Sequence, residues 1–299
     1  MVLTESKTRI LAALVEARGD VSEAAKLAGV SKQYVYEVLG KLKRAGVKLR
    51  GYPFLSSLGR VFIAFCGYQP PDNGFLVCRL KIYRFSGGIL EAGIYLIPRN
   101  LSVSLGYMKL RGAVVEELFD IYTTAPWYDI VDLRPNRGTL LPRAPKLEPD
   151  YEDWVIMLNL YEDLFAHVTE STPTVSKSRL SYHYRFHVRK ILQVLVDFHP
   201  EKMHAKPLLF AEVKAPSEEW LSTLLRARHV YILMPRLNCL AGYALLDASD
   251  PYDLLKRIAI AREEGRVELE VQMIGYVDLD ESFKPRLPLT VAHAGLRTA

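Results

Sequence analysis

Residues able to bind a polyanion gather at the start of this 299-residue chain. Residues 1–50 contain ten Lys or Arg and five Asp or Glu, whereas the remaining 249 residues contain 29 of each sign. The net charge of +5 therefore lies entirely in the first fifty residues. A local basic excess is an argument about partners and not about fold, and here it predicts a polyanion-binding end on a neutral body.

Residue patterns of catalysis are missing from the sequence. It contains no GxGxxG, GxxxxGK[ST], GxSxG or HExxH motif. The cysteines Cys66, Cys78 and Cys239 have no CxxC spacing, so they indicate neither a disulfide framework nor a zinc ribbon. We therefore expect a protein that is not an enzyme and that uses no cofactor.

One histidine pair, His183 and His187, is spaced so that both side chains share a helical face, as in some metal sites. The stretch HYRFH lacks the Glu of a zincin motif and has no third ligand close in sequence. By the repeat described below, His187 falls where Leu42 lies, which favours a partly buried structural histidine. The alternative that the two histidines tune the affinity for DNA with pH stays open, because imidazole titrates near neutrality. No metal is predicted.

Composition places the chain among ordinary globular proteins. Hydrophobic residues make up 49% and charged residues 24% of a length that predicts about two domains. No stretch approaches the roughly 20 apolar residues that span a bilayer, and the polar N-terminus lacks a signal-peptide core. We expect a cytoplasmic protein without a membrane partner. Four Gln, five Asn and three Cys resemble the composition of hyperthermophile proteins.

The basic end has the pattern of three helices and a strand. Apolar spacing predicts helices over Ser6–Arg18 and Lys32–Ala45, with a short Ala-rich helix over Ser22–Ala28 between them. Gly29 supplies the left-handed turn and Ser31 can cap the third helix. A basic hairpin that begins with a strand over 47–52 completes a winged helix-turn-helix, whose last helix enters a major groove.

In this unit Lys and Arg would lie near phosphates, while Gln33 and Tyr34 could reach base edges. A bundle with a solvated basic face, or a winged helix that contacts protein, is the alternative. The residues predicted to contact DNA are Ser31, Lys32, Gln33, Tyr34, Glu37, Lys41, Lys43, Arg44, Lys48 and Arg50.

The stretch AAKLAGVSKQYVYEVLGKLKRAGV resembles the DNA-binding domain of the Lrp/AsnC (feast/famine) transcription regulators of archaea and bacteria. The resemblance extends over most of the chain, because the family's pattern occurs in two copies, one in each half. Val30-Ser31-Lys32 recurs as Val175-Ser176-Lys177, an offset of 145 (176 − 31), and Ala92-Gly93 recurs as Ala241-Gly242, an offset of 149 (242 − 93). Such self-similarity indicates a tandem duplication.

Each half is expected to continue into a βαββαβ, ferredoxin-like sandwich, which resembles the RAM domain of that family. The fold class is therefore α+β, with two repeats forming an intramolecular pseudo-dimer. In the first half we expect strands over Arg60–Tyr68, Ile82–Phe85, Glu91–Ile97 and Trp127–Leu133, and helices over Asp72–Arg79 and Ser102–Tyr122. In the second half we expect strands over Leu208–Lys214, Val230–Met234, Cys239–Asp247 and Arg266–Val277, and helices over Ser217–Ala227 and Pro251–Glu264.

The second helix-turn-helix unit is less regular. Its middle helix is degenerate, and Ser171-Thr172-Pro173-Thr174 replaces the glycine turn. Residues 171–190 contain five Lys or Arg and no acid, whereas 148–170 contain seven acids and no Lys or Arg, as in a domain with one edge toward DNA. A purely structural role is the alternative. The residues predicted to contact DNA here are Ser176, Lys177, Ser178, Arg179, Tyr182 and Arg185.

These elements divide the chain into six segments. The segments are a first winged unit over 1–54, a first sandwich over 55–133, a basic Pro-rich linker over 134–149, a degenerate winged unit over 150–206, a second sandwich over 207–283 and a tail over 284–299. The linker could follow a phosphate backbone, although solubility explains its charge equally well.

The resemblance implies a transcription regulator whose partners are double-stranded DNA, a small-molecule effector and a second copy of the chain. Effector sites of the family lie near a glycine-containing turn, typically with an Asp. The corresponding turns, residues 86–90 and 235–238, lack an acid, which argues against an ordinary amino acid as effector. The alternative function is an effector-binding or protein-assembly module whose helix-turn-helix units contact protein.

Overall fold

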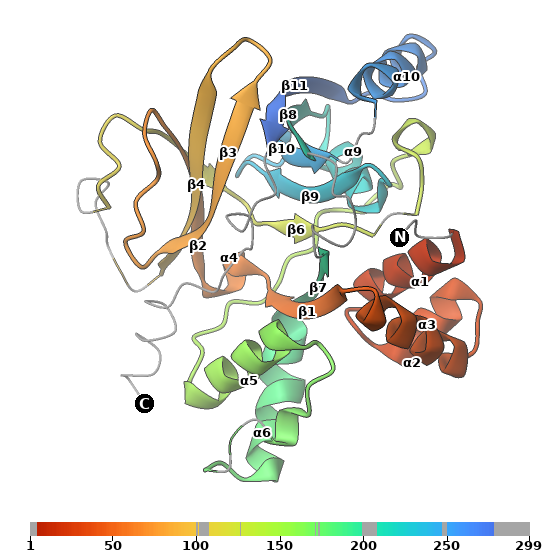
Figure 1. The fold of residues 1–299 in the computed structure, drawn as a ribbon, viewed down its shortest axis with the longest axis vertical. Helices are drawn as coiled ribbons and strands as arrows, with labels where there is room; N and C mark the ends of the chain where they lie inside the picture. The colour runs from red at the N-terminus through yellow and green to blue at the C-terminus, as the bar shows by residue number, and fades with distance from the viewer. Residues whose placement is uncertain are drawn as a thin grey trace.

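The computed structural model describes residues 5–99, 101, 108–125, 127–170, 172, 174–198, 208–246 and 250–277. These residues form an α+β fold of helices and antiparallel sheets (Figure 1). The predicted tail over 284–299 lies outside them. Two groups of helices, labelled α1 to α3 and α5 to α6, lie in the lower half of the view, and the larger sheet lies above them.

The first helical group consists of α1 (Glu5–Glu16), α2 (Val21–Ala28) and α3 (Lys32–Arg44). Ala24, Ala25 and Ala28 of α2 are buried, and their small side chains let the three helices pack closely. The second group consists of α5 (Tyr151–Glu162), a 3₁₀ turn at Val168–Glu170 and a continuous helix built from α6 (Lys177–His183), a π turn (Tyr184–Val188) and α7 (Arg189–Ile191).

A two-stranded antiparallel sheet joins the two helical groups. Its strands are β1 (Val47–Pro53) and β7 (Leu192–Phe198), which begin 145 residues apart (192 − 47). The register pairs Val47 with Phe198 and Pro53 with Leu192. The pairing is therefore symmetric about Arg50 and Leu195, two residues that are themselves 145 apart (195 − 50).

The expected wing is consequently not a hairpin. After β1 the chain turns through α4 (Leu55–Leu58) into the larger sheet, so β1 has no local return strand and takes its hydrogen bonds from β7 instead. Backbone groups of a strand need partners, and the equivalent strand of the other half supplies them.

The larger sheet has nine strands in the order β5-β2-β4-β3-β11-β8-β10-β9-β6. Within each half the order is the same, since the fourth strand lies beside the first, followed by the third and the second. The strands of the first half are β2 (Gly59–Cys66), β3 (Leu76–Arg84), β4 (Ile89–Pro98) and β5 (Val114–Leu118), followed by β6 (Tyr122–Thr123). Those of the second half are β8 (Leu208–Lys214), β9 (Val230–Pro235), β10 (Ala241–Leu246) and β11 (Glu270–Val277).

The halves of this sheet meet twice. At one junction β3 pairs with β11, and at the other Leu118 of β5 forms a bridge with Arg236, just after β9. The inner faces share one core, in which the ring of Phe65 from β2 lies 6.2 Å from that of Phe210 and 5.3 Å from that of Tyr243. The sheet therefore closes on itself around side chains from both halves.

Helices cover the outer face of the second half. α9 (Glu218–Thr223) is capped by Ser217, and α10 (Pro251–Glu263) is capped by Asp250. Their apolar residues, including Leu221 and Ile258, pack on the outward side of β8 to β10. The order of elements predicted for the second half from Leu208 to Val277 matches the structure.

Three predictions for the first half are wrong. Residues 72–79 are not a helix, because β3 begins at Leu76 after an Asn73-Gly74 turn. Residues 102–107 lie outside the described residues, and the rest of the helix expected over 102–122 is replaced by a turn, β5 and β6. The strand expected over 127–133 is a single bridge at Tyr128 and a 3₁₀ turn at Ile130–Asp132.

Asp120 fixes the position of α4 against the chain between β5 and β6. Its buried carboxylate accepts hydrogen bonds from the backbone N–H groups of Leu55, Ser56 and Ile121, and from the Ser56 hydroxyl. Burial outweighs these hydrogen bonds and raises the pKa of Asp120 from 3.8 to about 6.

The raised pKa of Asp120 predicts a pH-dependent stability. The folded chain holds this proton to a higher pH than the unfolded chain, so the contribution of Asp120 to the free energy of unfolding falls as the pH rises from 3.8 through about 6. The loss amounts to about 3 kcal/mol. Urea unfolding of the native protein and of Asp120→Asn, which does not titrate, should show their difference changing across this range. A constant difference would contradict the assignment.

Two glycines predict opposite effects of an added methyl group. A Cβ at Gly275 of β11 would lie 2.3 Å from the carbonyl oxygen of Tyr83, at the β3–β11 junction. We expect Gly275→Ala to lower the free energy of unfolding by about 3 kcal/mol through overpacking. A Cβ at Gly40, in the exposed face of α3, meets nothing within 4 Å. Gly40→Ala should raise stability by about 1 kcal/mol, and thermal unfolding distinguishes the two signs.

Candidate nucleic-acid interface

Three capping residues fix both ends of α2 and the start of α3. Asp20 begins α2 by accepting from the N–H groups of Ser22 and Glu23 at 2.9 and 3.0 Å. Gly29 ends α2 in the left-handed region with φ 66°, and Ser31 begins α3 by accepting from the N–H of Tyr34 at 3.1 Å. These caps fix the direction in which α3 leaves the group.

One face of α3 is buried and the other is exposed. Val35, Val38 and Leu42 are almost completely buried against α1 and α2. All the residues of α3 and its cap that were predicted to contact DNA are exposed, namely Ser31, Lys32, Gln33, Tyr34, Glu37, Lys41, Lys43 and Arg44. The arrangement presents three lysines and one arginine to solvent on a single short helix.

These exposed side chains form only weak interactions with the rest of the protein. Lys43 forms an ion pair with Asp163 at 3.4 Å, yet its side chain remains 80% exposed. Arg44 donates to the carbonyl oxygen of Gly40, and Tyr34 shares a hydrogen bond with Ser6. Exposed ion pairs contribute between 0 and about 1 kcal/mol, so a phosphate could displace them at little cost.

Arg50 does not belong to this exposed face, contrary to the prediction. Its guanidinium donates to the carbonyl oxygen of Tyr161 at 2.8 Å, lies 5.1 Å from the centre of the Tyr161 ring and is 3.7 Å from Glu162. Only 11% of its side chain is exposed. Lys48 and Arg50 lie on the same face of β1, because residues two apart along a strand share a face. Tyr161 and Glu162 at the end of α5 cover this face at Arg50, whereas Lys48 is exposed.

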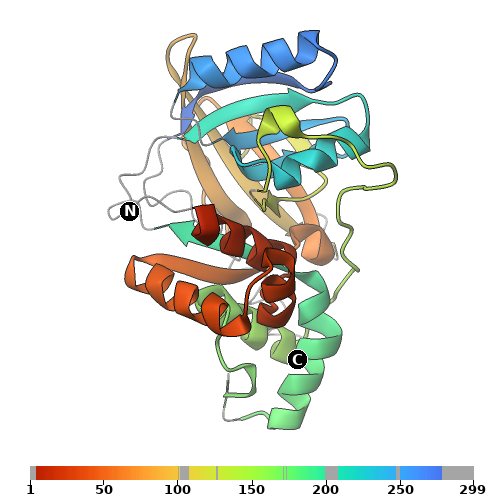
Figure 2. The ribbon, with the colours of Figure 1, turned by 90° about the vertical axis from the view of Figure 1, so that its right-hand side faces the viewer.

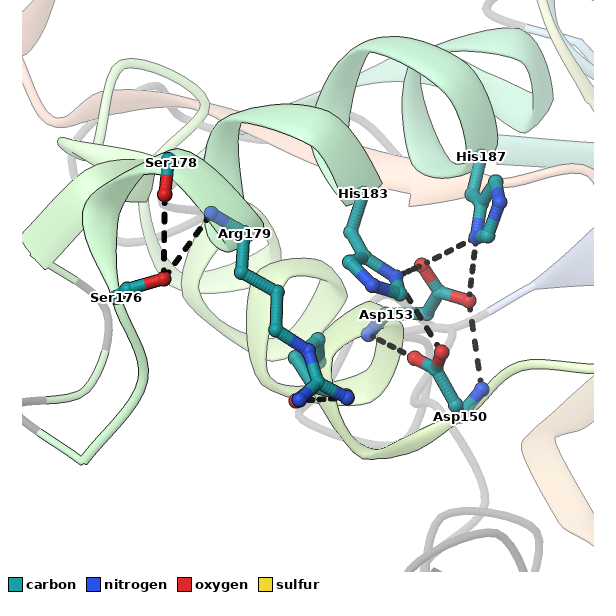
Figure 3. Close-up of polar contacts among 8 residues, drawn as sticks. Asp150, Asp153, Ser176, Ser178, Arg179, His183 and His187 are labelled. Atoms are coloured by element: carbon teal, nitrogen blue, oxygen red, sulfur yellow. Dashed lines mark hydrogen bonds and ion pairs between the residues drawn. The ribbon is translucent and has the colours of Figure 1, made fainter.

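The second helical group carries the other predicted contacts on α6 and the π turn. Ser176 caps the helix by accepting from the N–H of Arg179, in the same way that Ser31 caps α3. The six predicted residues are all exposed: Ser176, Lys177, Ser178, Arg179, Tyr182 and Arg185. Arg179 also forms an ion pair with the buried carboxylate of Glu152 at 2.9 Å (Figure 3).

Several acids of the run before this helix form ion pairs with Lys and Arg of both helical groups. Glu152 pairs with Arg179, Glu162 lies near Arg50, and Asp163 pairs with Lys43 of the first group. Another ion pair, between Arg189 and Asp20 at 2.9 Å, also joins the two groups. Ion pairs between opposite charges therefore link the two helical groups at their exposed edge.

Beneath α6, four side chains form the His–Asp cluster (Asp150, Asp153, His183 and His187; Figure 3). The Nδ1 atoms of both histidines lie 3.1 Å from Oδ1 of Asp153, and Nδ1 of His183 lies 3.3 Å from Oδ2 of Asp150. Burial, reinforced by the charge of Asp150, raises the pKa of Asp153, whereas the histidines act in the opposite direction. His183 is buried and His187 is half-buried, as predicted for structural histidines.

Sequence reasoning missed several residues of this region. The two carboxylates of the cluster lie about thirty residues before the histidines, so only the packing of α5 on α6 reveals them. Also missed were the exposed rings of Tyr36 and Phe186, the latter 5.0 Å from that of Tyr182. Tyr182 and Phe186 are four residues apart, so residue spacing alone could have predicted that their rings share one face of the helix.

The linker packs against the body. Arg143 forms an ion pair with Glu218 at 3.0 Å, and Arg134 donates to the carbonyl oxygen of Arg266. Leu141 is buried. These contacts favour a structural role for residues 134–149 over a role in following the phosphate backbone.

The second of the two effector turns is occupied by protein. Arg236 pairs with Glu116 of β5 at 2.7 Å and with Glu212 at 2.9 Å, and the N–H of Leu237 donates to the carbonyl oxygen of Glu117. The first turn, at Gly87 and Gly88, has positive φ angles at both glycines. These contacts make the two turns unlike each other.

Comparison with protein-family models, with curated proteins and with solved structures found no match to this chain. Within the described residues, no helix has the length and apolar character needed to cross a bilayer.

We expect Ala substitutions at Arg50 and at Lys48 to differ in their effect on the free energy of unfolding. Removing the guanidinium in Arg50→Ala should lower the free energy of unfolding by about 2 kcal/mol, because a charged hydrogen bond and a cation–π contact between β1 and α5 are lost. Lys48→Ala, on the same face of β1 but beyond the part that α5 covers, should change it by less than about 0.5 kcal/mol. Chemical unfolding of both variants tests this, and equal effects would show that Arg50 does not join the groups.

Proposed function

We propose that this protein is a duplex-DNA-binding transcription regulator of the Lrp/AsnC type. The observation that carries the proposal is the exposed face of α3, which presents Lys32, Lys41, Lys43 and Arg44 on a helix capped at Ser31 and preceded by the left-handed turn at Gly29. A capped basic helix after such a turn is the element that helix-turn-helix proteins insert into a major groove.

The proposed role of each residue follows from its place on α3. Lys and Arg side chains give sequence-independent affinity for phosphates. Gln33 is exposed in the first turn, where side chains of a recognition helix contact base edges, and its amide could pair with adenine. Glu37, one turn further along the exposed face, could accept from the amino group of cytosine.

We propose a tandem arrangement of two helix-turn-helix units and two ferredoxin-like units as an intramolecular pseudo-dimer. The strand order supports it in both halves, whereas among the described residues only the second half has the two covering helices. In each half the strands follow the order that a βαββαβ chain gives, and β1 pairs with β7 about a symmetric centre. Two-fold arrangements of this kind present two recognition helices to two half-sites. We propose that α6, with Lys177 and Arg185 exposed, is the second reading helix.

Salt-dependent binding tests this function. Fluorescence anisotropy of labelled duplexes, measured from about 50 to about 200 mM salt, should give an affinity that falls steeply. Each phosphate contact removed reduces the slope of log K against log salt by about 0.9. The triple variant Lys32→Ala, Lys41→Ala, Arg44→Ala should therefore lower the slope by about 3, and the double variant Lys177→Ala, Arg185→Ala by about 2.

A charge-matched control keeps the result specific. Lys109, Lys214 and Lys256 are exposed outside the helical groups, and their triple Ala variant should leave the slope unchanged. Absence of DNA binding at low salt, or equal slopes in the α3 variant and this control, would refute the proposal. That result would favour helix-turn-helix units that contact protein. Loss of slope in the α3 variant alone would restrict DNA binding to the first unit.

A further inference from the structure

We propose that the His–Asp cluster binds one divalent transition-metal ion, with Zn²⁺ as the ion it fits best. The cluster joins two helices of the second group. Asp150 and Asp153 come from the start of α5, and His183 and His187 come from α6 and the π turn (Figure 3). One nitrogen or oxygen from each side chain lies within 4.8 Å of the other three.

The spacing of these atoms matches a tetrahedral ion. In a zinc site with bonds of about 2.0 to 2.1 Å, neighbouring ligand atoms are about 3.3 Å apart. Nδ1 of His183 and Nδ1 of His187 each lie 3.1 Å from Oδ1 of Asp153, and Nδ1 of His183 lies 3.3 Å from Oδ2 of Asp150. Three edges of the tetrahedron are therefore already close to their length in a metal complex.

The helix cap leaves these ligand atoms available. Asp150 and Asp153 form a capping box, in which Oδ1 of Asp150 accepts from the N–H of Asp153 and Oδ2 of Asp153 accepts from the N–H of Asp150. The other oxygen of each carboxylate faces the histidines. Backbone hydrogen bonds to a ligating carboxylate are the usual means of orienting it toward a metal.

Charge balance also favours a cation. The side chain of Asp153 is only 1% exposed, and the carboxylate of Asp150 lies in the same cluster. Two carboxylates that share a buried site repel each other unless a positive charge lies between them. A divalent ion with two neutral imidazoles would neutralise both. Asp150 is 41% and His187 31% exposed, which gives the ion a route from solvent.

Packing does not require these residues, as the first half of the chain shows. At the repeat offset of 145, His183 corresponds to Val38 (183 − 145) and His187 to Leu42 (187 − 145), and both are buried apolar residues. The equivalent helix therefore packs well with two aliphatic side chains. The cluster is an addition to the second half, and His187 lies in a π turn, a distortion that occurs frequently at functional sites.

The set of donors selects the class of ion. Two imidazole nitrogens with two carboxylate oxygens suit Zn²⁺ and its first-row neighbours, whereas Mg²⁺ and Ca²⁺ prefer oxygen ligands alone. With four protein ligands the site would be closed, as structural zinc sites are. Its effect would be to fasten α6 to α5. Metal binding does not depend on the proposed binding of DNA, so either proposal can fail without the other.

Metal titration of the whole chain tests the site. Protein stripped with a chelator is titrated with Co²⁺, followed by visible absorption, and then with Zn²⁺, followed by calorimetry. We expect one ion per chain, a tetrahedral Co²⁺ spectrum that Zn²⁺ abolishes, and a higher thermal unfolding temperature with the ion bound. Mg²⁺ should not compete.

Variants separate the cluster from other histidines. His187→Ala should weaken Zn²⁺ binding by at least about 100-fold, the upper range for loss of a residue that merely supports a ligand. His183→Gln serves as a second variant that preserves side-chain volume, and circular dichroism checks that both fold. His167→Ala, at an exposed histidine in the same half, should bind as the native chain does. A native chain without a tetrahedral Co²⁺ spectrum, or a His187→Ala protein of native affinity, would overturn the proposal.

Discussion

The antiparallel pairing of β1 with β7 is the constraint on which the rest of the arrangement depends. Each strand follows a helical group and, after a short connection, leads toward four strands of the larger sheet. Seven residue pairs in a symmetric register fix the relative position of everything attached to them. A shift of β1 by one residue would exchange the buried Val47 and Leu49 for the exposed Lys48, so the register is strongly determined.

The closed sheet supplies the stability that a seven-pair ribbon lacks. A two-stranded ribbon is marginal alone, whereas the larger sheet buries aromatic and aliphatic side chains from both halves in one core. Phe210 stacks on Tyr243, and Phe65 from the other half packs edge-on against both rings. Neither half could bury this surface without the other, so the halves are one cooperative unit despite their internal repetition.

Local sequence patterns predict an element correctly where that element is capped and amphipathic. The helix begun by Ser31 is predicted because its cap and its apolar spacing agree. The wrong predictions concern segments whose structure is determined by pairing with residues distant in sequence. Val114–Leu118 is a strand because β2 offers it a free edge, and β1 lacks a hairpin because its partner lies 145 residues on. For the same reason the histidines of the cluster could be found from spacing, but the carboxylates opposite them could not.

At the centre of the β1–β7 ribbon, a residue of one half pairs with an unlike residue of the other half. Where a two-fold axis relates identical chains, the residue on the axis faces its own copy. Here Arg50 faces Leu195, and its guanidinium is received by Tyr161 and Glu162 of the other half. A homodimer of the first half would place two arginines directly opposite each other, which is unfavourable for like charges. The unlike pair at the centre of the ribbon therefore favours pairing of the first half with the second half over pairing of the first half with its own copy.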